Sequence, residues 1–431
     1  MNQLSRLSTA LVGAGPANLA VLACMQDLCP DLVARTQLIE RRSNSDWHPD
    51  FRFDSSTLQV SLLKDLAFTR DPTSKFTFWS FMHQQNLLNQ FIHLNTYYPS
   101  RSLFSRYLNW VQDHFDQITR FDTEVTEIQP AKDGYRIRLA EGEDRRESEI
   151  LTRNVVIALG HEPHMPSHLK CGDDTFHAIK FQSEFERHRH RKDLRVAVVG
   201  AGQTAGELIQ NLMRMENVSD ILSLSRGFLF RQTDDNPFVN DLYTFNGMRK
   251  MRDDAPIRRR ALMAELSNSN YAAVTSDILQ DIYRLNFEDS LNDRQRLRLQ
   301  SHSEVLEVSK VSEGLRLVIR DGLGNRQVET VDLLVACTGF RNSRHLDLLA
   351  PLDLRLNDDG QIAVNQNYRV EGTGPQSGIF LVNHATDTAL AEHTLGGLAG
   401  RAELICKDLF DIDASWKPQS TTQGQLATAA V

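Results

Sequence analysis

The sequence lacks several features that define other classes of protein. None of its apolar runs approaches the roughly 18 residues of a membrane-spanning helix. Basic residues do not prevail either: 48 Lys and Arg against 56 Asp and Glu give a net charge of −8, which disfavours a nucleic acid or membrane partner. The 431 residues include five cysteines, too few and too scattered for a disulfide framework. These absences predict a soluble protein of a reducing compartment, the cytoplasm.

The chain does have the length and composition of a multidomain globular protein. At roughly 150 residues per domain, 431 residues predict two or three domains. The contents of 41% hydrophobic and 24% charged residues are typical of folded chains. The last residues, 417–431, are small and polar, and we expect them to be disordered.

A first nucleotide-binding pattern lies near the N-terminus. The segment TALVGAGPANLA places an apolar strand before a turn and a helix, with Gly13, Gly15, Pro16 and Asn18 in the turn. Glycines there permit close approach of a pyrophosphate to backbone N–H groups at a helix start. The next apolar strand ends in Glu40, where an acid can bind a ribose 2′-hydroxyl. We interpret this context as a dinucleotide site, although residues 7–24 also have the apolar pattern of a signal peptide.

A second pattern of the same kind begins near residue 194. It reads LRVAVVGAGQTAGELIQ and places Gly200 and Gly202 between a strand and a helix. The following strand ends in Arg226 rather than in an acid, and arginine can pair with a 2′-phosphate. We therefore predict NADP at the second turn and FAD at the first. This is the layout of a flavoprotein in which NADPH reduces the flavin.

These patterns predict an α/β fold with two Rossmann-like dinucleotide-binding domains, for FAD and NADP, and a small, mostly helical substrate or cap region. Two further apolar strands stop at Gly160 and Gly339, where we expect the chain to cross between domains. The predicted division is an FAD domain of residues 1–180 and 328–431 and an NADP domain of 185–327, with a helical insertion at about 236–290.

One cysteine pair has the spacing of a redox disulfide. Cys24 and Cys29 are separated by four residues, as in flavoprotein disulfide reductases. They fall within the helix after the first turn, and residues five apart do not share a helix face. We expect these thiols to be buried apolar groups rather than a redox centre.

Several longer segments resemble one family. They are GPANL, the stretch 46–82 with LQVSLLKDL, Tyr98-Pro99-Ser100-Arg101, GAGQTAGE, NPFVND, Asn270-Tyr271 and ACTGF. Together they cover nearly the whole chain and resemble the flavin-dependent lysine/ornithine N-monooxygenases of siderophore biosynthesis. The resemblance implies N-hydroxylation of a primary amine: NADPH reduces FAD, O2 forms a flavin hydroperoxide, and the amine attacks its distal oxygen. It also implies a homo-oligomer, a tetramer or dimer.

The resemblance assigns roles to individual positions, and it implies no metal. Catalytic roles fall on Gln203 and Asn270. Substrate-binding positions are Gln59, Lys64, Asn240 and Gly396. FAD-binding positions are Gly13, Gly15, Pro16, Asn18, Glu40, Trp47, His48 and Gln59. NADP-binding positions are Gly200, Gly202, Gln203, Thr204, Arg226 and Asn270. Without the resemblance, Lys64 would be a possible partner for a substrate carboxylate or a surface lysine, and Asn240 a turn-forming residue.

Near the C-terminus the sequence departs from the family pattern. Gly396 stands where the family has a serine that helps to hold the reacting amine, and Thr388-Ala389 replaces the usual His-Gly. His393, one turn earlier than Gly396, offers a compensating side chain. Lys64 favours a substrate with a carboxylate, ornithine or lysine, whereas Gly396 favours a related amine such as histamine, putrescine or cadaverine.

Two other functions stay open at this point. A carbon- or sulfur-oxidising flavin monooxygenase would carry F-x-G-x-x-x-H before the second turn, but CGDDTFHAIKF has a different spacing. A non-catalytic NADPH-sensing flavoprotein would need the dinucleotide turns but not the substrate positions.

Overall fold

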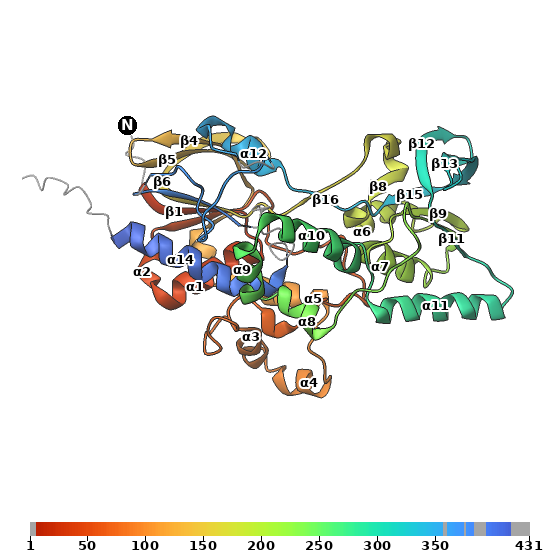
Figure 1. Cartoon of the computed structure of the whole chain (residues 1–431), viewed down its shortest axis with the longest axis horizontal. Helices are drawn as coiled ribbons and strands as arrows, with labels where there is room; N and C mark the ends of the chain where they lie inside the picture. Colours follow the sequence, from red (N-terminus) through yellow and green to blue (C-terminus); the bar gives the residue numbers. More distant parts are fainter. Residues whose placement is uncertain (1–5, 357–359, 375, 383–393, 415–431) are drawn as a thin grey trace, which may run out of the picture.

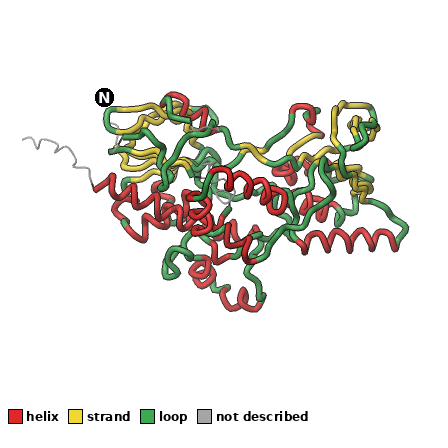
Figure 2. Tube along the Cα trace, viewed as in Figure 1, coloured by secondary structure: helices red, strands yellow, loops and turns green. Residues whose placement is uncertain are grey.

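The computed structural model describes residues 6–356, 360–374, 376–382 and 394–414. Two main sheets lie toward opposite ends of the long axis, with helices between and below them (Figure 1, Figure 2). The predicted α/β class is confirmed. Within the described residues, no helix is both long and apolar enough to cross a membrane. Thr388, Ala389, His393 and the tail 417–431 lie outside the described residues.

The first sheet carries the first glycine turn. Its order is β3-β2-β1-β6-β5-β4, and β17 also pairs with β6. The strands are β1 (Arg6–Val12), β2 (Thr36–Ile39), β3 (Thr119–Arg120), β4 (Thr123–Ala131), β5 (Gly134–Glu141), β6 (Arg146–Ile157) and β17 (Gly378–Leu381). β1 is parallel to β2 and β6, whereas β4, β5 and β6 form an antiparallel run. β17 pairs in parallel with β6, so the C-terminal part of the chain returns to the first sheet.

Three long helices cover one side of the first sheet. They are α1 (Pro16–Leu28), α5 (Arg101–Asp113) and α14 (Leu398–Ala414). α1 is apolar around its circumference and buried continuously from Ala17 to Met25, as expected for a helix enclosed by other elements. The apolar N-terminal stretch thus forms β1 and a core helix. The shorter helices of this region are α2 (Pro30–Val33), α3 (Phe78–Gln84) and α4 (Leu88–His93).

The second sheet is wholly parallel, with the order β11-β10-β9-β15-β8. Its strands are β8 (Thr175–His177), β9 (Leu194–Val199), β10 (Val218–Leu224), β11 (Leu297–Gln300) and β15 (Leu333–Ala336). Apolar side chains of α7 (Gln203–Leu212) and α11 (Ser276–Leu291) pack on one face. The other face packs on a three-stranded antiparallel sheet of β12 (Glu304–Val311), β13 (Gly314–Arg320) and β14 (Arg326–Val331).

Two antiparallel segments join the sheets, at the places where the sequence predicted crossings. β7 (Glu162–Pro163) pairs with β16 (Phe340–Arg341). Each follows a glycine of positive φ, Gly160 at +70° and Gly339 at +77°, a conformation that favours glycine. The sheet pairing differs from the predicted division at both boundaries. β8 and β15 pair in the second sheet, whereas the predicted division placed them in the FAD domain of residues 1–180 and 328–431. The sequence did not reveal this pairing because the partner strands lie far away in sequence.

The predicted helical insertion packs in two different places. α8 (Pro237–Leu242), α9 (Phe245–Asp253) and α10 (Pro256–Leu266) lie between the sheets, and α9 crosses the start of α14 (Figure 1). Gly397 lies against the end of the Met248 side chain, since a Cβ there would lie 2.0 Å from Cε of Met248. α11, in contrast, packs on α7. Only the α8–α10 part therefore reaches the first sheet region.

Candidate functional site

The first glycine turn is closed on one side and open on the other. Gly13 has φ +95°, and a Cβ there would lie 2.4 Å from the carbonyl oxygen of Ala158. At Gly15 a Cβ would meet no atom within 4 Å. Pro16 occupies the first position of α1, where its missing N–H costs no hydrogen bond. The structure therefore explains Gly13 by packing, whereas the space at Gly15 is available to a ligand.

Side chains fix the shape of this turn. The Ala14 N–H donates to Oε2 of Glu40 over 2.9 Å. The Asn18 amide donates to the carbonyls of Val12 at 3.0 Å and Gly13 at 2.8 Å. Asn18 thus braces the turn at the position usually held by a third glycine. Its buried Oδ1 has no hydrogen-bond partner among the described residues.

The second glycine turn repeats the first. Gly200 has φ +134°, and a Cβ there would lie 2.4 Å from the carbonyl oxygen of Cys337. Gln203 follows at the start of α7, where Oε1 accepts from the Thr275 N–H at 2.9 Å. Its amide donates to Glu207 at 3.0 Å. Both ends of the Gln203 side chain are therefore held, which orients it at the mouth of the turn.

The other NADP positions surround this turn. Thr204 is half-buried in the first turn of α7, and Arg226 is exposed just after β10. A Cβ on Gly202 would lie 3.4 Å from the carbonyl oxygen of Tyr271, so the Asn270 segment borders the turn. The Asn270 amide donates to the carbonyl of Asp234 at 2.8 Å. This bond links the segment to the residues that lead into α8.

The substrate positions only partly converge. A Cβ on Gly396 would lie 2.8 Å from the carbonyl oxygen of Tyr243 and 3.2 Å from Cδ of Lys64. Lys64 and the end of α8 thus meet at Gly396. Asn240 lies on α8 but is exposed, and its amide donates to the carbonyl of Asp235 at 2.7 Å. Gln59 is also exposed, and no hydrogen bond among the described residues joins it to Lys64.

The Trp47-His48 pair lies on a loop between β2 and α3. Their ring centroids are 4.7 Å apart, and His48 adopts φ +49°. Burial, together with nearby Arg101 and other arginines, lowers the pKa of His48 to about 4. The imidazole is therefore uncharged at neutral pH.

A buried ion pair that we did not predict joins the two sheet regions. Arg101 at the start of α5 donates to Oε1 of Glu207 over 2.6 Å, and the Glu207 side chain is only 2% exposed. Ser56 also donates to Glu207, at 3.3 Å. Burial raises the pKa of Glu207, and Arg101 opposes that shift. The available signal was Glu207 itself, an acid directly before the apolar residues Leu208 and Ile209 in the helix that follows the second turn.

Cys24 is buried in α1 as expected, whereas Cys29 is half-buried and caps the end of that helix instead of lying within it. All five cysteines are free, and Cys24 and Cys29 form no disulfide. Cys24 instead faces Cys406 of α14, and a hydrogen bond between the two thiols lowers the pKa of Cys24. Burial raises the pKa of Cys337 far above its usual value.

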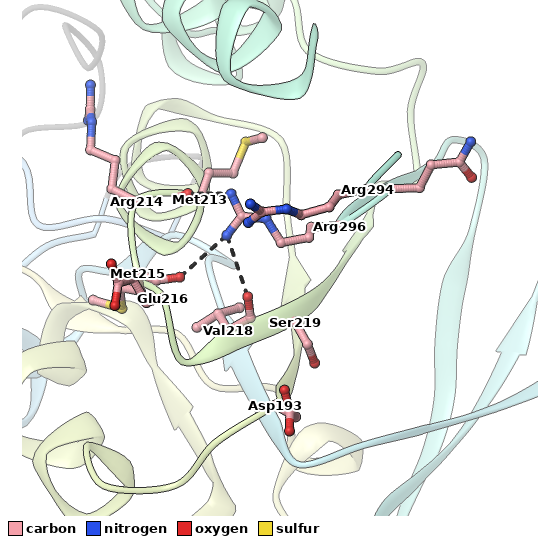
Figure 3. Close-up of a pocket in the computed structure, with 10 residues that line it drawn as sticks. Asp193, Met213, Arg214, Met215, Glu216, Val218, Ser219, Arg294 and Arg296 are labelled. Carbon is pink, nitrogen blue, oxygen red and sulfur yellow. Dashed lines mark hydrogen bonds between the residues drawn. The ribbon is translucent and has the colours of Figure 1, made fainter. Parts of the chain in front are cut away.

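A surface pocket is lined by residues other than the predicted site residues (Figure 3). It has a volume of about 580 Å³ and lies at the amino ends of β9, β10 and β11. Dinucleotides bind at the carboxyl ends of such strands. Arg296 at its centre donates to the carbonyls of Met213, Met215 and Val218 and to Asp289. This arginine supports the end of α7 and the start of β10.

Comparisons with known proteins agree with this arrangement. The chain belongs to the L-lysine 6-monooxygenase/L-ornithine 5-monooxygenase family, whose model matches residues 6–342. It is 29% identical to an L-ornithine N(5)-monooxygenase of Pseudomonas aeruginosa over 93% of this chain and 92% of that protein. It is 30% identical to the corresponding protein of Burkholderia cepacia, over 80% and 81%.

A solved structure extends the likeness to three dimensions. The ornithine N-hydroxylase of Kutzneria sp. 744 matches with a TM-score of 0.88 and 27% identity, over 94% of this chain and 99% of that one. That structure is of a complex with reduced FAD, NADP+ and L-ornithine. The predicted family and enzyme class, a flavin-dependent N-monooxygenase, are confirmed.

Proposed function

We propose that this chain N-hydroxylates the terminal amine of L-ornithine or L-lysine with FAD, NADPH and O2, for a hydroxamate-type siderophore. One observation carries the proposal. A single chain holds two dinucleotide turns with ribose-side residues of opposite charge, Glu40 and Arg226, and brings Lys64 to the end of α8 at Gly396. We also propose the division into FAD and NADP domains, with β8 and β15 in the latter, and a homo-oligomer in the cytoplasm.

The residues present fit both dinucleotides. The open space at Gly15 lies at the amino end of α1, where N–H groups attract a pyrophosphate. Glu40 braces this turn at the end of β2. At the second turn, Gly202 and exposed Arg226 suit a pyrophosphate and a 2′-phosphate. These contacts support FAD at the first turn and NADPH at the second.

Flavin reduced by NADPH supplies one oxygen atom of O2 to the amine. The products from amine, O2, NADPH and a proton are a hydroxylamine, water and NADP+. In this scheme the chain positions both reactants: Gln203 lies fixed between Thr275 and Glu207, and Lys64 holds the substrate carboxylate. His48, uncharged at neutral pH, adds no positive charge at the FAD site to which the resemblance assigns it. An amine must be neutral to react, because an ammonium group has no lone pair.

The test is an amine panel. Purified protein with FAD and NADPH is mixed with ornithine, lysine, histamine, putrescine and cadaverine, and hydroxylamine and hydrogen peroxide are measured. We expect ornithine or lysine to give hydroxylamine with little peroxide. A coupled reaction with histamine or a diamine would support the second candidate, which Gly396 favours. Reduction of the flavin without hydroxylamine from any amine would contradict N-hydroxylation and favour carbon or sulfur oxidation. If NADPH does not reduce the bound flavin, the result would favour a non-catalytic NADPH-sensing flavoprotein.

A further inference from the structure

An exposed aromatic side chain lies on the loop that follows β10. Phe228 is two residues after Arg226, and 62% of its surface is exposed. Phe230, in contrast, packs against the apolar core of the second sheet. A single exposed apolar side chain is no sign of function. The place of Phe228 is informative, because β10 ends at Leu224 and ligands of parallel sheets bind at the carboxyl ends of the strands.

Hydrogen bonds hold the loop that carries Phe228 against the end of the neighbouring strand, β11. The Ser303 N–H donates to the carbonyl of Ser225 at 2.8 Å. The His302 N–H donates to the carbonyl of Gly227 at 2.9 Å. The hydroxyl of Ser225 donates to the carbonyl of Phe228 at 3.2 Å. The loops after β10 and β11 are therefore tied together, and Phe228 is exposed on a fixed backbone.

A second ring lies beside Phe228 at this edge of the sheet. The ring centroids of Phe228 and His302 are 6.5 Å apart, and the ring planes are inclined by 55°. His302 is exposed and adopts φ +49°. A Cβ on Gly322 would lie 2.9 Å from Cβ of His302, so the turn between β13 and β14 lies against this histidine. The two rings form one angled, exposed aromatic surface at the carboxyl ends of β10 and β11.

We propose that the adenine ring of NADPH stacks on Phe228, with His302 at the edge of the stacked base. This inference rests on the proposed function and goes beyond it by assigning the base of the nucleotide to two further residues. In NADPH, the adenine and the 2′-phosphate are attached to adjacent carbons of one ribose. Because Arg226 suits the 2′-phosphate, the base must lie beside the same loop. Every base has a π-face that stacks on an aromatic side chain.

A contact with the base has a different selectivity from a contact with the 2′-phosphate. NADP+ and NAD+ carry the same adenine, so stacking on Phe228 strengthens the binding of both by the same factor. Arg226, in contrast, distinguishes them by the phosphate. Adenosine 2′,5′-bisphosphate keeps the base and the 2′-phosphate but has no nicotinamide. The three ligands together therefore separate a contact with the base from a contact with either of the other groups.

The experiment measures the Kd of these three ligands by calorimetry on the FAD-loaded protein, in which the first turn is already filled. Phe228→Ala should raise the Kd of all three by one common factor, at least roughly fivefold. His302→Ala should give a smaller rise, because only the edge of the inclined ring meets the base. Arg226→Ala should weaken NADP+ and the bisphosphate but not NAD+. Phe228→Trp should keep the affinity, and adenosine 2′,5′-bisphosphate should quench the fluorescence of the added indole.

Matched controls are Phe287→Ala and Phe287→Trp, at a phenylalanine of α11 that is 57% exposed. Neither should change a Kd, and the indole at position 287 should not be quenched. An unchanged Kd in Phe228→Ala, or a loss confined to ligands with the 2′-phosphate, would overturn the inference. Absence of binding by all three ligands would overturn it together with the proposed function. If they bind with the expected dependence on Phe228 but no amine is hydroxylated, the proposed function fails and this inference stands.

Discussion

Arg101 and Glu207 form an ion pair of 2.6 Å that is almost entirely enclosed by protein. One residue begins α5 of the first region, and the other lies on α7 behind the second glycine turn. Removal of one partner leaves the other charge buried without compensation, which costs about 3–5 kcal/mol. Glu207→Gln should therefore lower the free energy of unfolding by that amount, measured by denaturant titration.

The same variant should also slow flavin reduction by NADPH, because Glu207 holds the Gln203 amide. Stopped-flow absorbance under anaerobic conditions measures this rate. Glu216→Gln, at an exposed acid shortly after α7, is the control and should change stability by less than about 0.5 kcal/mol. Equal stability of the two variants would show that the Arg101–Glu207 ion pair contributes nothing to the free energy of unfolding.

Gly13 and Gly15 of the first turn differ in why a larger residue would be unfavourable. Gly13→Ala combines positive φ with a contact to Ala158, so the apoprotein should lose at least about 1 kcal/mol of stability. Gly15→Ala meets no atom within 4 Å and should leave the apoprotein as stable as the wild type. Gly15→Ala should nevertheless weaken FAD binding at least ~tenfold, since the backbone must approach the pyrophosphate. Titration followed by flavin fluorescence measures the Kd of FAD for each variant. An unchanged FAD affinity in Gly15→Ala would show that the pyrophosphate binds elsewhere.

Arg226 should determine the preference for NADPH over NADH. A hydrogen bond between charged groups contributes about 1.5–3 kcal/mol, so Arg226→Ala should raise KM for NADPH by roughly ten- to hundredfold. KM for NADH should not change, because NADH has no 2′-phosphate. Arg231→Ala, at another exposed arginine shortly after β10, is the matched control. A parallel rise for both nucleotides would assign Arg226 to a different contact.

Gly396→Ser tests whether the family's serine fits this chain. Its Cβ would meet the Tyr243 carbonyl at 2.8 Å, and relief of such overpacking costs typically about 1–3 kcal/mol. We expect lower stability and a higher KM for the amine, instead of improved activity. Gly374→Ser, where a Cβ meets nothing within 4 Å, should behave as wild type. A Gly396→Ser enzyme with a lower KM would show that α8 moves aside at no cost.

His177 should make the fold sensitive to acid. Burial lowers its pKa to about 4, so between pH 6.5 and 4 the unfolded chain binds a proton that the folded chain does not. Stability therefore falls as the pH decreases through this window. From pH 7 to pH 5, the wild type should lose up to about 2 kcal/mol more than His177→Gln. Unfolding midpoints at the two pH values measure this, with exposed His190→Gln as the control, and equal losses would contradict it.

Local features were predictable from the sequence, and distant contacts were not. Both glycine turns, the position of Glu40 and the crossings after Gly160 and Gly339 follow from short segments whose backbone requirements are local. The Arg101–Glu207 pair joins residues 106 apart, and no periodicity specifies such a partner. The pairing of β8 with β15 in the second sheet was not predicted either, because three residues carry too little pattern to choose a sheet. The contact of Gly396 with Tyr243 likewise depends on how α8 and α14 pack.

The carbonyls of Ala158 and Cys337 close the two glycine turns, and each lies only a few residues before a crossing segment, β7 or β16. The connections between the sheets therefore begin at the walls of the nucleotide sites. A rotation of one sheet region against the other pulls on both walls at once. The walls of both turns therefore continue directly into the same pair of linkers, β7 and β16.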